Sequence, residues 1–306
     1  MKFIKMHGCG NDYVYLDAIS EPSLAGLPDS KGWAGTVAAM SDRHTGIGSD
    51  GVILVCPPTA AARRRGAAVR MRMFNADGSE SGMCGNGVRC VAKVANDRLG
   101  IAQNPMKVET GWGVLTIGYK LRRGKIQSAT VDMGRPVLSP KAVPMDTRHA
   151  AFRGQGRHWG VQSGEVIVIG VPVSMGNPHL VVFDSPANAT RDLSPAELRR
   201  LPLDYVGPMF EAHAAFPERV NLHFVACRSP GHIVMRSWER GSGITRACGT
   251  GACAAVVAGV LTERIGREVD VDLPGGRLKI AWDKVTGRVF MTGPAVEVFE
   301  GTWENA

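Results

Sequence analysis

The sequence predicts an α/β protein built from two similar halves. Its 306 residues are enough for two compact domains of ordinary size. A Cys-Gly-x-Gly segment occurs twice, at Cys84 and at Cys248. Each copy follows an aromatic residue, Phe74 or Trp238, by the same distance, since 84 − 74 = 10 and 248 − 238 = 10. The two copies therefore indicate one repeated unit of strand, loop, cysteine and helix.

The local patterns support this unit. Apolar and basic residues alternate over residues 69–73, which is typical of a half-buried strand, and residues 233–238 form a less regular strand candidate. Helical stretches closed by glycines follow the two motifs, over 88–99 with Gly100 and over 252–265 with Gly266. Further short β-rich runs are bounded mostly by Gly, Pro or Asn and cover 52–56, 108–117, 166–173, 180–183, 222–226 and 269–273.

The repeat extends back to an asparagine in each half. Asn11 precedes the first motif cysteine by 84 − 11 = 73 residues, and Asn177 precedes the second by 248 − 177 = 71. We place the junction between the halves near residues 127–132, which predicts domains over 1–128 and 129–294. Ser194 with Pro195 and Glu197 predicts a capped peripheral helix that opens a polar excursion running to about Pro217.

Composition excludes several classes of protein. With 21% charged and 44% hydrophobic residues the chain is typical of a globular protein, and no apolar run reaches the roughly 20 residues of a membrane helix. The start lacks a secretory signal, so we expect a cytoplasmic protein with seven free thiols and no membrane partner. The cysteine spacing predicts no metal site. The net charge of +8 is scattered apart from Arg63-Arg64-Arg65, so we expect no nucleic-acid partner.

The two motif cysteines have the chemistry of acid/base groups. Taken alone, Cys84 or Cys248 would more often be a buried small residue. A cysteine at the first turn of a helix, however, can have its pKa lowered from about 8.5 to roughly 3.5–7.5. The glycines beside it let backbone N–H groups approach an anion. Two such thiols on opposite faces of one carbon are what inversion of a stereocentre by proton transfer requires, one as thiolate and one as thiol.

Several ordered segments resemble the diaminopimelate epimerase family, which interconverts LL- and meso-diaminopimelate for lysine and peptidoglycan synthesis. The resemblance covers nearly the whole chain. It rests on Lys5-Met6-His7-Gly8-Cys9-Gly10-Asn11-Asp12, Phe74-Asn75-Ala76-Asp77-Gly78-Ser79, Cys84-Gly85-Asn86-Gly87-Val88-Arg89-Cys90, Ser174-Met175-Gly176-Asn177-Pro178-His179, Pro217-Glu218-Arg219-Val220-Asn221, Glu239-Arg240-Gly241, Ala247-Cys248-Gly249-Thr250-Gly251-Ala252 and Asp272-Leu273-Pro274-Gly275-Gly276.

The resemblance implies a fold of two pseudo-symmetric domains, each a curved mixed sheet wrapped around a central helix, with a C-terminal strand at 295–306 returning to the first domain. It also implies a homodimer and no pyridoxal phosphate or other cofactor. Cys84 and Cys248 match the family's catalytic thiols. The turns expected to hold the reacting carboxylate match Gly85, Asn86, Gly249 and Thr250.

The same resemblance assigns the far end of the substrate, where a second ammonium and carboxylate need both charged and neutral partners. An arginine can clamp a carboxylate and a glutamate can pair with an ammonium, while amides supply donors and acceptors. The matching residues are Asn11, Asn75, Asn177, Asn221, Glu239 and Arg240. Two roles stay open for His179, which can hold a neighbouring thiol or brace its loop.

The chain departs from the family pattern in places. Gly51 stands where some members carry a glutamine that contacts substrate, and residues 63–65 and 148–159 are predicted to be local insertions. A proline or hydroxyproline racemase-like enzyme is the nearest alternative, although Glu239-Arg240 and the asparagines argue against it. A phenazine-type isomerase normally lacks the cysteine pair. A non-enzymatic binding protein would require both thiols to be structural.

Overall fold

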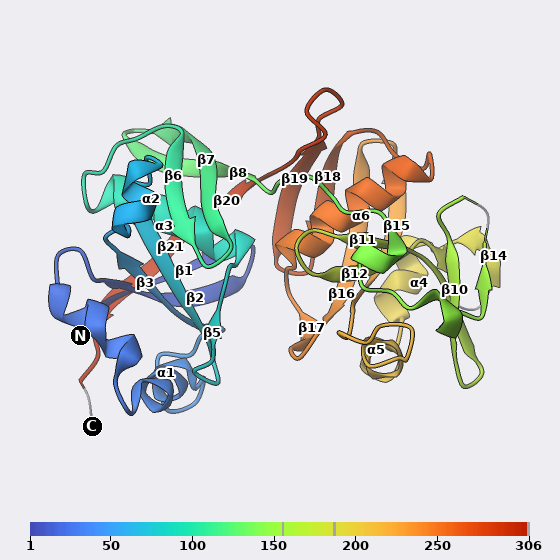
Figure 1. Cartoon of the computed structure of the whole chain (residues 1–306), viewed down its shortest axis with the longest axis horizontal. Helices are drawn as coiled ribbons and strands as arrows, with labels where there is room; N and C mark the ends of the chain where they lie inside the picture. Colours follow the sequence, from blue (N-terminus) through green and yellow to red (C-terminus); the bar gives the residue numbers. More distant parts are fainter. Residues whose placement is uncertain (155, 186–187, 305–306) are drawn as a thin grey trace. The chain divides into compact units, whose positions relative to one another are not determined.

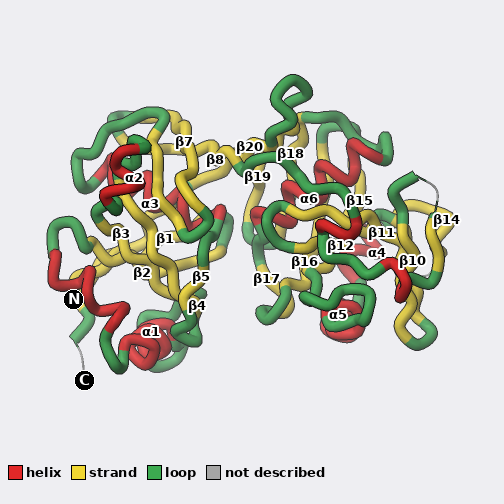
Figure 2. Tube along the Cα trace, in the orientation of Figure 1, coloured by secondary structure: helices red, strands yellow, loops and turns green. Residues whose placement is uncertain are grey.

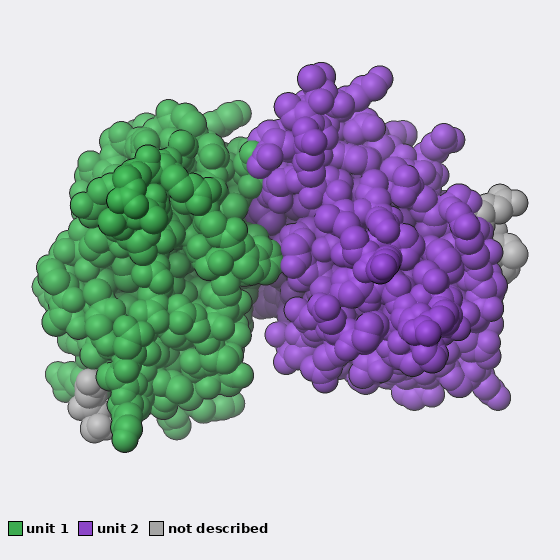
Figure 3. All heavy atoms as spheres, in the orientation of Figure 1, with its two compact units in different colours: residues 1–132, 292–306 green, residues 133–291 purple. Residues whose placement is uncertain are grey.

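The structure is a computed structural model that describes residues 1–154, 156–185 and 188–304. It divides into two compact units, drawn in different colours in Figure 3. Unit 1 contains Met1–Asp132 and Thr292–Ala306, and unit 2 contains Met133–Met291. These boundaries lie a few residues from the junctions expected at 128/129 and 294/295. Within the described residues, no helix is both long and apolar enough to cross a membrane.

Unit 1 is a mixed sheet around one helix, α3 (Gly85–Asp97). Its strands lie in the order β21, β1, β2, β3, β4, β6, β7, β8, and the β2–β3 and β4–β6 pairs are parallel while the others are antiparallel. Helix α3 contacts strands from β1 to β8, so the sheet curves around it (Figure 1). The other bounds are β1 Lys2–Gly8, β2 Asn11–Asp17, η1 Pro22–Asp29, α1 Trp33–Ser41, β3 Gly51–Cys56, α2 Ala60–Arg64, β4 Val69–Asn75, β5 Glu80–Ser81, β6 Met106–Thr110, β7 Gly113–Arg122, β8 Lys125–Asp132 and β21 Val296–Thr302.

Unit 2 repeats this arrangement around α6 (Gly249–Leu261). Its strands lie in the order β9, β10, β11, β12, β15, β16, β18, β19, with β12–β15 and β16–β18 parallel. Figure 2 shows α3 and α6 lying among the strands of their own units. The other bounds are η2 Pro140–Ala142, η3 Thr147–His149, β9 Phe152–Arg153, β10 Trp159–Ser163, β11 Val166–Ser174, β12 Pro178–Val182, β13 Asp184–Ser185, β14 Asn188–Asp192, α4 Pro195–Arg200, α5 Leu203–Glu211, β15 Asn221–Ser229, β16 His232–Glu239, β17 Gly243–Thr245, β18 Glu268–Leu273 and β19 Gly276–Trp282. Strand β20, Val289–Pro294, begins in unit 2 and ends in unit 1.

The two units match in strand register as well as in strand order. Val14 lies opposite Val52 in the parallel β2–β3 pair, and Leu180 lies opposite Leu222 in the parallel β12–β15 pair. Counting outward from these pairs makes Asn11 equivalent to Asn177 and Gly51 equivalent to Asn221. It also makes Ile53 equivalent to His223. The internal repeat expected from the cysteine spacing is confirmed at the level of individual strand positions.

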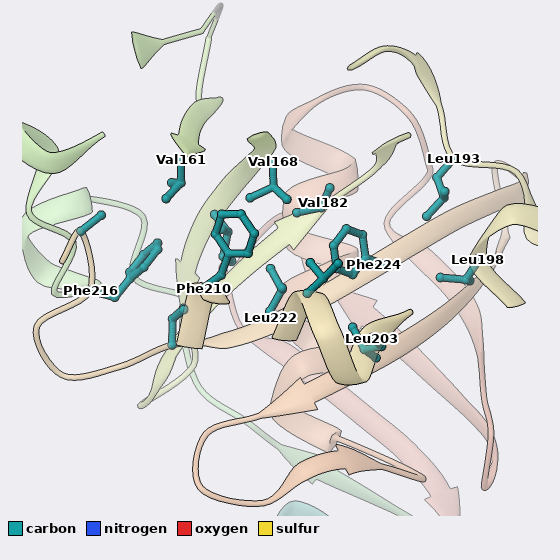
Figure 4. Close-up of a cluster of buried hydrophobic side chains, with 14 of the residues drawn as sticks. Val161, Val168, Val182, Leu193, Leu198, Leu203, Phe210, Phe216, Leu222 and Phe224 are labelled. Atoms are coloured by element: carbon teal, nitrogen blue, oxygen red, sulfur yellow. The ribbon is translucent and has the colours of Figure 1, made fainter. Parts of the chain in front are cut away.

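The sheet of unit 2 is covered on both faces. Successive residues of each strand point to opposite faces, so each strand contributes side chains to both. Leu222 and Phe224 of β15 point into a core shared with α4 and α5, where they lie with Phe210 (Figure 4). Asn221 and His223 point to the opposite face, which packs on α6. In unit 1 the outer core lies under α1 and η1 and includes Trp33 stacked edge-on against Phe74 at 5.4 Å.

Most elements agree with the sequence, and the differences have local causes. The alternating strand over 69–73 is confirmed as part of β4, and Ser194 forms the predicted capping box with Glu197. The expected polar excursion to Pro217 is wrong, because its apolar residues, such as Phe216, are buried in the core. The run over 108–117 is two strands, β6 and β7, separated by a tight turn.

Both central helices begin and end at earlier residues than the sequence predicts. They start at Gly85 and Gly249 instead of Val88 and Ala252, because the cysteine itself is the N-cap and the glycines form the first turn. Helix α3 ends at Asp97, ahead of Gly100. Helix α6 ends at Leu261, because the backbone turns to a left-handed φ of 57° at Glu263 before Gly266 is reached.

Candidate active site

Each motif cysteine caps the central helix of its own unit. Cys84 and Cys248 have extended backbone, with φ of −133° and −115°. The amide of the residue three positions on, Gly87 or Gly251, donates to the cysteine sulfur at 3.3 Å. Sulfur therefore occupies the place where a serine or aspartate oxygen usually caps a helix, and an anionic sulfur there is stabilised by the N–H group and the helix dipole.

Asn11 organises the surroundings of Cys84. The Cys84 thiol donates to Asn11 Oδ1 at 3.2 Å, and Asn86 Nδ2 donates to the same oxygen at 3.4 Å. Asn11 Nδ2 in turn donates to Asp50 Oδ2 at 2.7 Å, and Arg43 Nη2 holds Asp50 Oδ1 at 2.8 Å. Because a carboxylate accepts but cannot donate, Asp50 fixes the amide of Asn11 with its oxygen toward the thiol.

Asn86 is held by an arginine that the sequence did not single out. Arg89 is fully buried, and its Nη1 donates to Asn86 Oδ1 at 3.0 Å and to Gly85 O at 3.4 Å. Its Nε donates to the carbonyl oxygen of Pro294 at 3.2 Å. The guanidinium thus fixes Asn86 and braces the first turn of α3 from inside the unit.

Asn75 lies at the end of β4 and belongs to a separate loop. Its Nδ2 donates to Ser79 Oγ at 3.0 Å, within the same loop. Gly51 lies opposite Asn75 in the strand register, and a Cβ on Gly51 would stand 1.9 Å from the carbonyl oxygen of Phe74. This backbone therefore has no room for a glutamine side chain at position 51.

Cys248 has a more enclosed and more acidic neighbourhood. Only 2% of the residue is exposed, and its sulfur lies 3.7 Å from Thr250 Oγ1. Burial and the adjacent Glu239 carboxylate together hold the pKa of the Cys248 thiol well above its usual value. Glu239 also accepts a hydrogen bond from Thr245 Oγ1. The sequence had assigned Glu239 to the far end of the substrate, whereas the structure places it beside a motif cysteine.

Asn221 and Arg240 are joined through the backbone. Asn221 Oδ1 accepts from the Arg240 amide at 3.0 Å, and its Nδ2 donates to Pro178 O at 2.8 Å, so its amide braces two loops. The Arg240 guanidinium donates to Glu218 O at 2.7 Å and lies at the surface of the unit. Glu211, which the sequence analysis missed, supports the same loop by accepting from the Gly241 amide at 2.9 Å.

His179 has both ring nitrogens engaged inside unit 2. Nε2 lies 2.9 Å from Asn177 Oδ1, and Nδ1 lies 2.8 Å from His223 Nε2. The ring is fully buried, and burial together with His223 and Arg240 holds its pKa well below the usual value. Of the two roles left open by the sequence, these bonds favour bracing of the loop that carries Asn177.

The second glycine of each motif allows a close approach from the sheet. A Cβ on Gly251 would lie 2.3 Å from His223 Cε1, and a Cβ on Gly87 would lie 2.7 Å from Ile53 Cδ1. The Ile53 methyl is the end of a flexible side chain, whereas the His223 ring is held at both nitrogens, by His179 and by Ser237.

We therefore expect Gly251→Ala to destabilise the protein by about 1–3 kcal/mol through overpacking. The matched Gly87→Ala variant should lose clearly less, because Ile53 can change rotamer and alanine favours the helix. Thermal unfolding of both variants beside the wild type measures the difference. Equal losses of stability would contradict this account of the two glycines.

The residues missed by the sequence analysis share one property. Each of them holds another side chain or a loop in place. They are Asp50, Arg89, Glu211, His223 and Ser237, and all except Arg89, which lies in helix α3, lie apart from the cysteine motifs in the sequence. A charged residue between two apolar ones, as at Arg89 between Val88 and Cys90, was the available signal. Within the described residues no group of three or more His, Cys, Asp or Glu side chains is placed to hold a metal ion.

Comparison with known proteins shows the family of this chain. A family model described as "Diaminopimelate epimerase" matches residues 3–139 and 171–298. Proteins of that name are 44% identical in Desulforudis audaxviator, over 100% of both chains, and 39% identical in Methanococcus maripaludis, over 98% of this chain and 99% of the relative. The unmatched residues 140–170 include the stretch 148–159 that was expected to be an insertion.

A solved structure shares the fold at much lower sequence identity. It is a hydroxyproline epimerase from Agrobacterium vitis with bound trans-4-OH-L-proline, and it has a TM-score of 0.65 at 17% identity, covering 98% of this chain and 91% of the other. A probable proline racemase from Agrobacterium radiobacter gives a TM-score of 0.66 at 14% identity, covering 99% and 92%. At these identities the likeness shows the fold alone.

Proposed function

Because the chain belongs to the diaminopimelate epimerase family, we propose that it interconverts LL- and meso-diaminopimelate by moving a proton at one α-carbon between Cys84 and Cys248. The observation that carries this proposal is the pair of cysteines, each the N-cap of the central helix of its unit and each accepting an N–H bond at 3.3 Å. Family membership supplies the substrate, and the caps supply the two acid/base groups.

The proton balance follows from the two thiols. In one direction Cys84 first gives the proton that it shares with Asn11 Oδ1 to solvent. The resulting thiolate takes the α-proton, the C–H electron pair stays on the substrate as a carbanion, and the Cys248 thiol delivers its own proton to the opposite face. Cys84 then ends as thiol and Cys248 as thiolate, so the reverse reaction uses the exchanged roles. The raised pKa of Cys248 supports its assignment as the protonated member of the pair before this direction of the reaction.

The helix starts are proposed to carry the reacting carboxylate. The first-turn amides next to Gly85, Asn86, Gly249 and Thr250 are suited to bind an anion, and they stabilise charge that develops as the α-proton leaves. This stabilisation takes the place of an electron-sink cofactor, so we propose catalysis without pyridoxal phosphate.

Recognition of the rest of the substrate is divided among polar side chains. We propose that Arg240 clamps a carboxylate and that Asn11, Asn75 and Asn177 add hydrogen bonds, whereas Asn221 acts by bracing the Arg240 loop. Because Glu239 acts on the pKa of Cys248, we propose that it works at the reacting centre instead of the far end.

The setting of the enzyme is proposed on the same basis. The seven cysteines stand outside disulfide bonds, which suits a reducing cytoplasm and an intracellular role in lysine and peptidoglycan precursor synthesis. A homodimer is supported by strand β21, which exposes Val296, Val298 and Phe299 on unit 1. An exposed apolar edge strand of this kind is typical of an interface, and we propose that a second copy of the chain packs on it.

Incubation with LL-diaminopimelate in deuterated water tests the function. We expect meso product with deuterium at the inverted α-carbon, because the delivered proton comes from a thiol that exchanges with solvent. Chiral chromatography measures the product, and mass spectrometry measures its deuterium. L-Proline and trans-4-hydroxy-L-proline serve as competing substrates. Turnover of either imino acid without turnover of LL-diaminopimelate would show that the racemase-like alternative is right.

A further inference from the structure

A chain of buried hydrogen bonds crosses unit 2 beneath the motif helix. His223 Nδ1 lies 2.8 Å from Ser237 Oγ, His223 Nε2 lies 2.8 Å from His179 Nδ1, and His179 Nε2 lies 2.9 Å from Asn177 Oδ1. The two rings are fully buried and Ser237 is 2% exposed. The chain begins inside the sheet and ends at Asn177, on the loop that the family pattern places at the substrate.

The chain has one direction. A neutral imidazole has one N–H donor and one acceptor nitrogen, and burial keeps both rings neutral, lowering the pKa of His223 to about 3. Since the amide oxygen of Asn177 can accept and not donate, His179 must carry its proton on Nε2. His179 Nδ1 then accepts from His223 Nε2–H, and His223 Nδ1 accepts from the Ser237 hydroxyl.

We propose that His223 is a positioning residue for substrate recognition, which together with Ser237 and His179 locks the side-chain amide of Asn177 so that its Nδ2–H group is presented as a hydrogen-bond donor. A donor at this place selects a substrate oxygen, such as one from a carboxylate, and disfavours an ammonium. The inference rests on the proposed function for the identity of the substrate.

The equivalent asparagine of unit 1 is locked in the opposite sense. Asp50 accepts from Asn11 Nδ2 at 2.7 Å, so Asn11 presents its oxygen to the Cys84 thiol. In unit 2 the Asn177 side-chain oxygen accepts the hydrogen bond from His179, so the Asn177 side-chain nitrogen is the end that is presented as a donor. The two units therefore hold equivalent asparagines with different partners. Asn11 presents its amide oxygen and Asn177 presents its amide nitrogen.

Packing alone does not require a histidine at this position. His223 lies against Gly251 just as Ile53 lies against Gly87, and the register makes Ser237 equivalent to Met73. Unit 1 fills the same space with isoleucine and methionine, which have no such hydrogen bonds. Packing thus does not account for His223 and Ser237 in unit 2, whereas their hydrogen bonds connect them through His179 to Asn177.

The tautomers of the two rings provide a test that needs no substrate. In protein labelled with ¹⁵N-histidine, long-range ¹H–¹⁵N correlation spectra distinguish the protonated from the unprotonated ring nitrogen, and single histidine substitutions assign the signals. We expect His179 and His223 both to carry hydrogen on Nε2, and both rings to stay neutral below the pH at which an ordinary histidine takes up a proton, because burial lowers both pKa values. A proton on Nδ1 of either ring would reverse the chain and overturn the proposal.

Substitutions at His223 test its effect on recognition. For His223→Leu we expect KM for LL-diaminopimelate to rise about tenfold, the loss of roughly one hydrogen bond, with kcat nearly unchanged because binding is lost equally in the ground and transition states. His223→Gln should restore KM, because its amide can donate to His179 and accept from Ser237. Ser237→Ala should raise KM by less than His223→Leu, and the double variant should be no worse than His223→Leu alone.

The controls separate positioning from structure and from the proposed function. Ser229→Ala, at the exposed end of the same strand, should leave KM and the ring spectra unchanged. If His223→Leu does not fold, Ser237→Ala carries the test. An unchanged KM and His179 spectrum in the folded variants, or a His223→Gln variant as impaired as His223→Leu, would overturn the proposal. Wild-type protein that shows the expected tautomers and does not turn over diaminopimelate would refute the proposed function and leave the hydrogen-bond chain standing.

Discussion

The Cys84→Ala and Cys248→Ala variants are each expected to lose epimerisation by a factor of roughly 10²–10⁴, the usual contribution of one positioned acid/base group. The reason is geometric, since each thiol caps the central helix of its own unit. The measurement is the rate of meso product formation from LL-diaminopimelate, with α-deuterium incorporation followed in the same samples.

Structural damage must be separated from loss of chemistry in these variants. Cys227→Ala is a suitable control, because Cys227 is a half-buried free thiol outside the motifs. It should keep wild-type activity, and all three variants should keep a cooperative unfolding transition. If either motif variant folds and still inverts the substrate at the wild-type rate, the two-thiol mechanism is wrong.

The Gly51→Ala variant is expected to lose about 3 kcal/mol or more of folding free energy. Gly51 has a φ of 152°, and a Cβ there would stand 1.9 Å from the Phe74 carbonyl oxygen. That atom belongs to the backbone of the neighbouring strand, so β3 and β4 would have to separate at Asn75. Such a loss is at the upper end of what single substitutions cause, and Tm should fall by roughly 2–4 °C for each kcal/mol.

Gly118→Ala is the matched comparison. Gly118 also lies within a strand, β7, and a Cβ there would meet nothing within 4 Å. We expect this variant to unfold at or slightly above the wild-type temperature in the same thermal scan, because alanine restricts the unfolded chain. A Gly51→Ala protein that unfolds together with Gly118→Ala would show that the β3–β4 backbone has more room than the structure gives it.

Much of the fold was readable from spacing and pattern. The distance from Phe74 to Cys84 and from Trp238 to Cys248 predicted a repeat, and the matching strand registers of β2–β3 and β12–β15 confirm it. Alternation over residues 69–73 predicted β4, because a strand with one face on the central helix must alternate. The segment after Ser194 was misjudged, because its apolar residues are spaced among polar ones and its burial depends on the facing sheet.

The amino-acid sequence alone determined the repeat, the place of Cys84 and Cys248 at the starts of two helices, and the family resemblance, since these depend on residues near one another in the chain. Tertiary structure decided which groups act on them. Asp50 reaches Asn11 across 50 − 11 = 39 residues, and His223 reaches His179 across 223 − 179 = 44. Such partners meet through strand pairing and helix packing, which fix the orientation of amides and the tautomers of rings, and no local pattern encodes those distances.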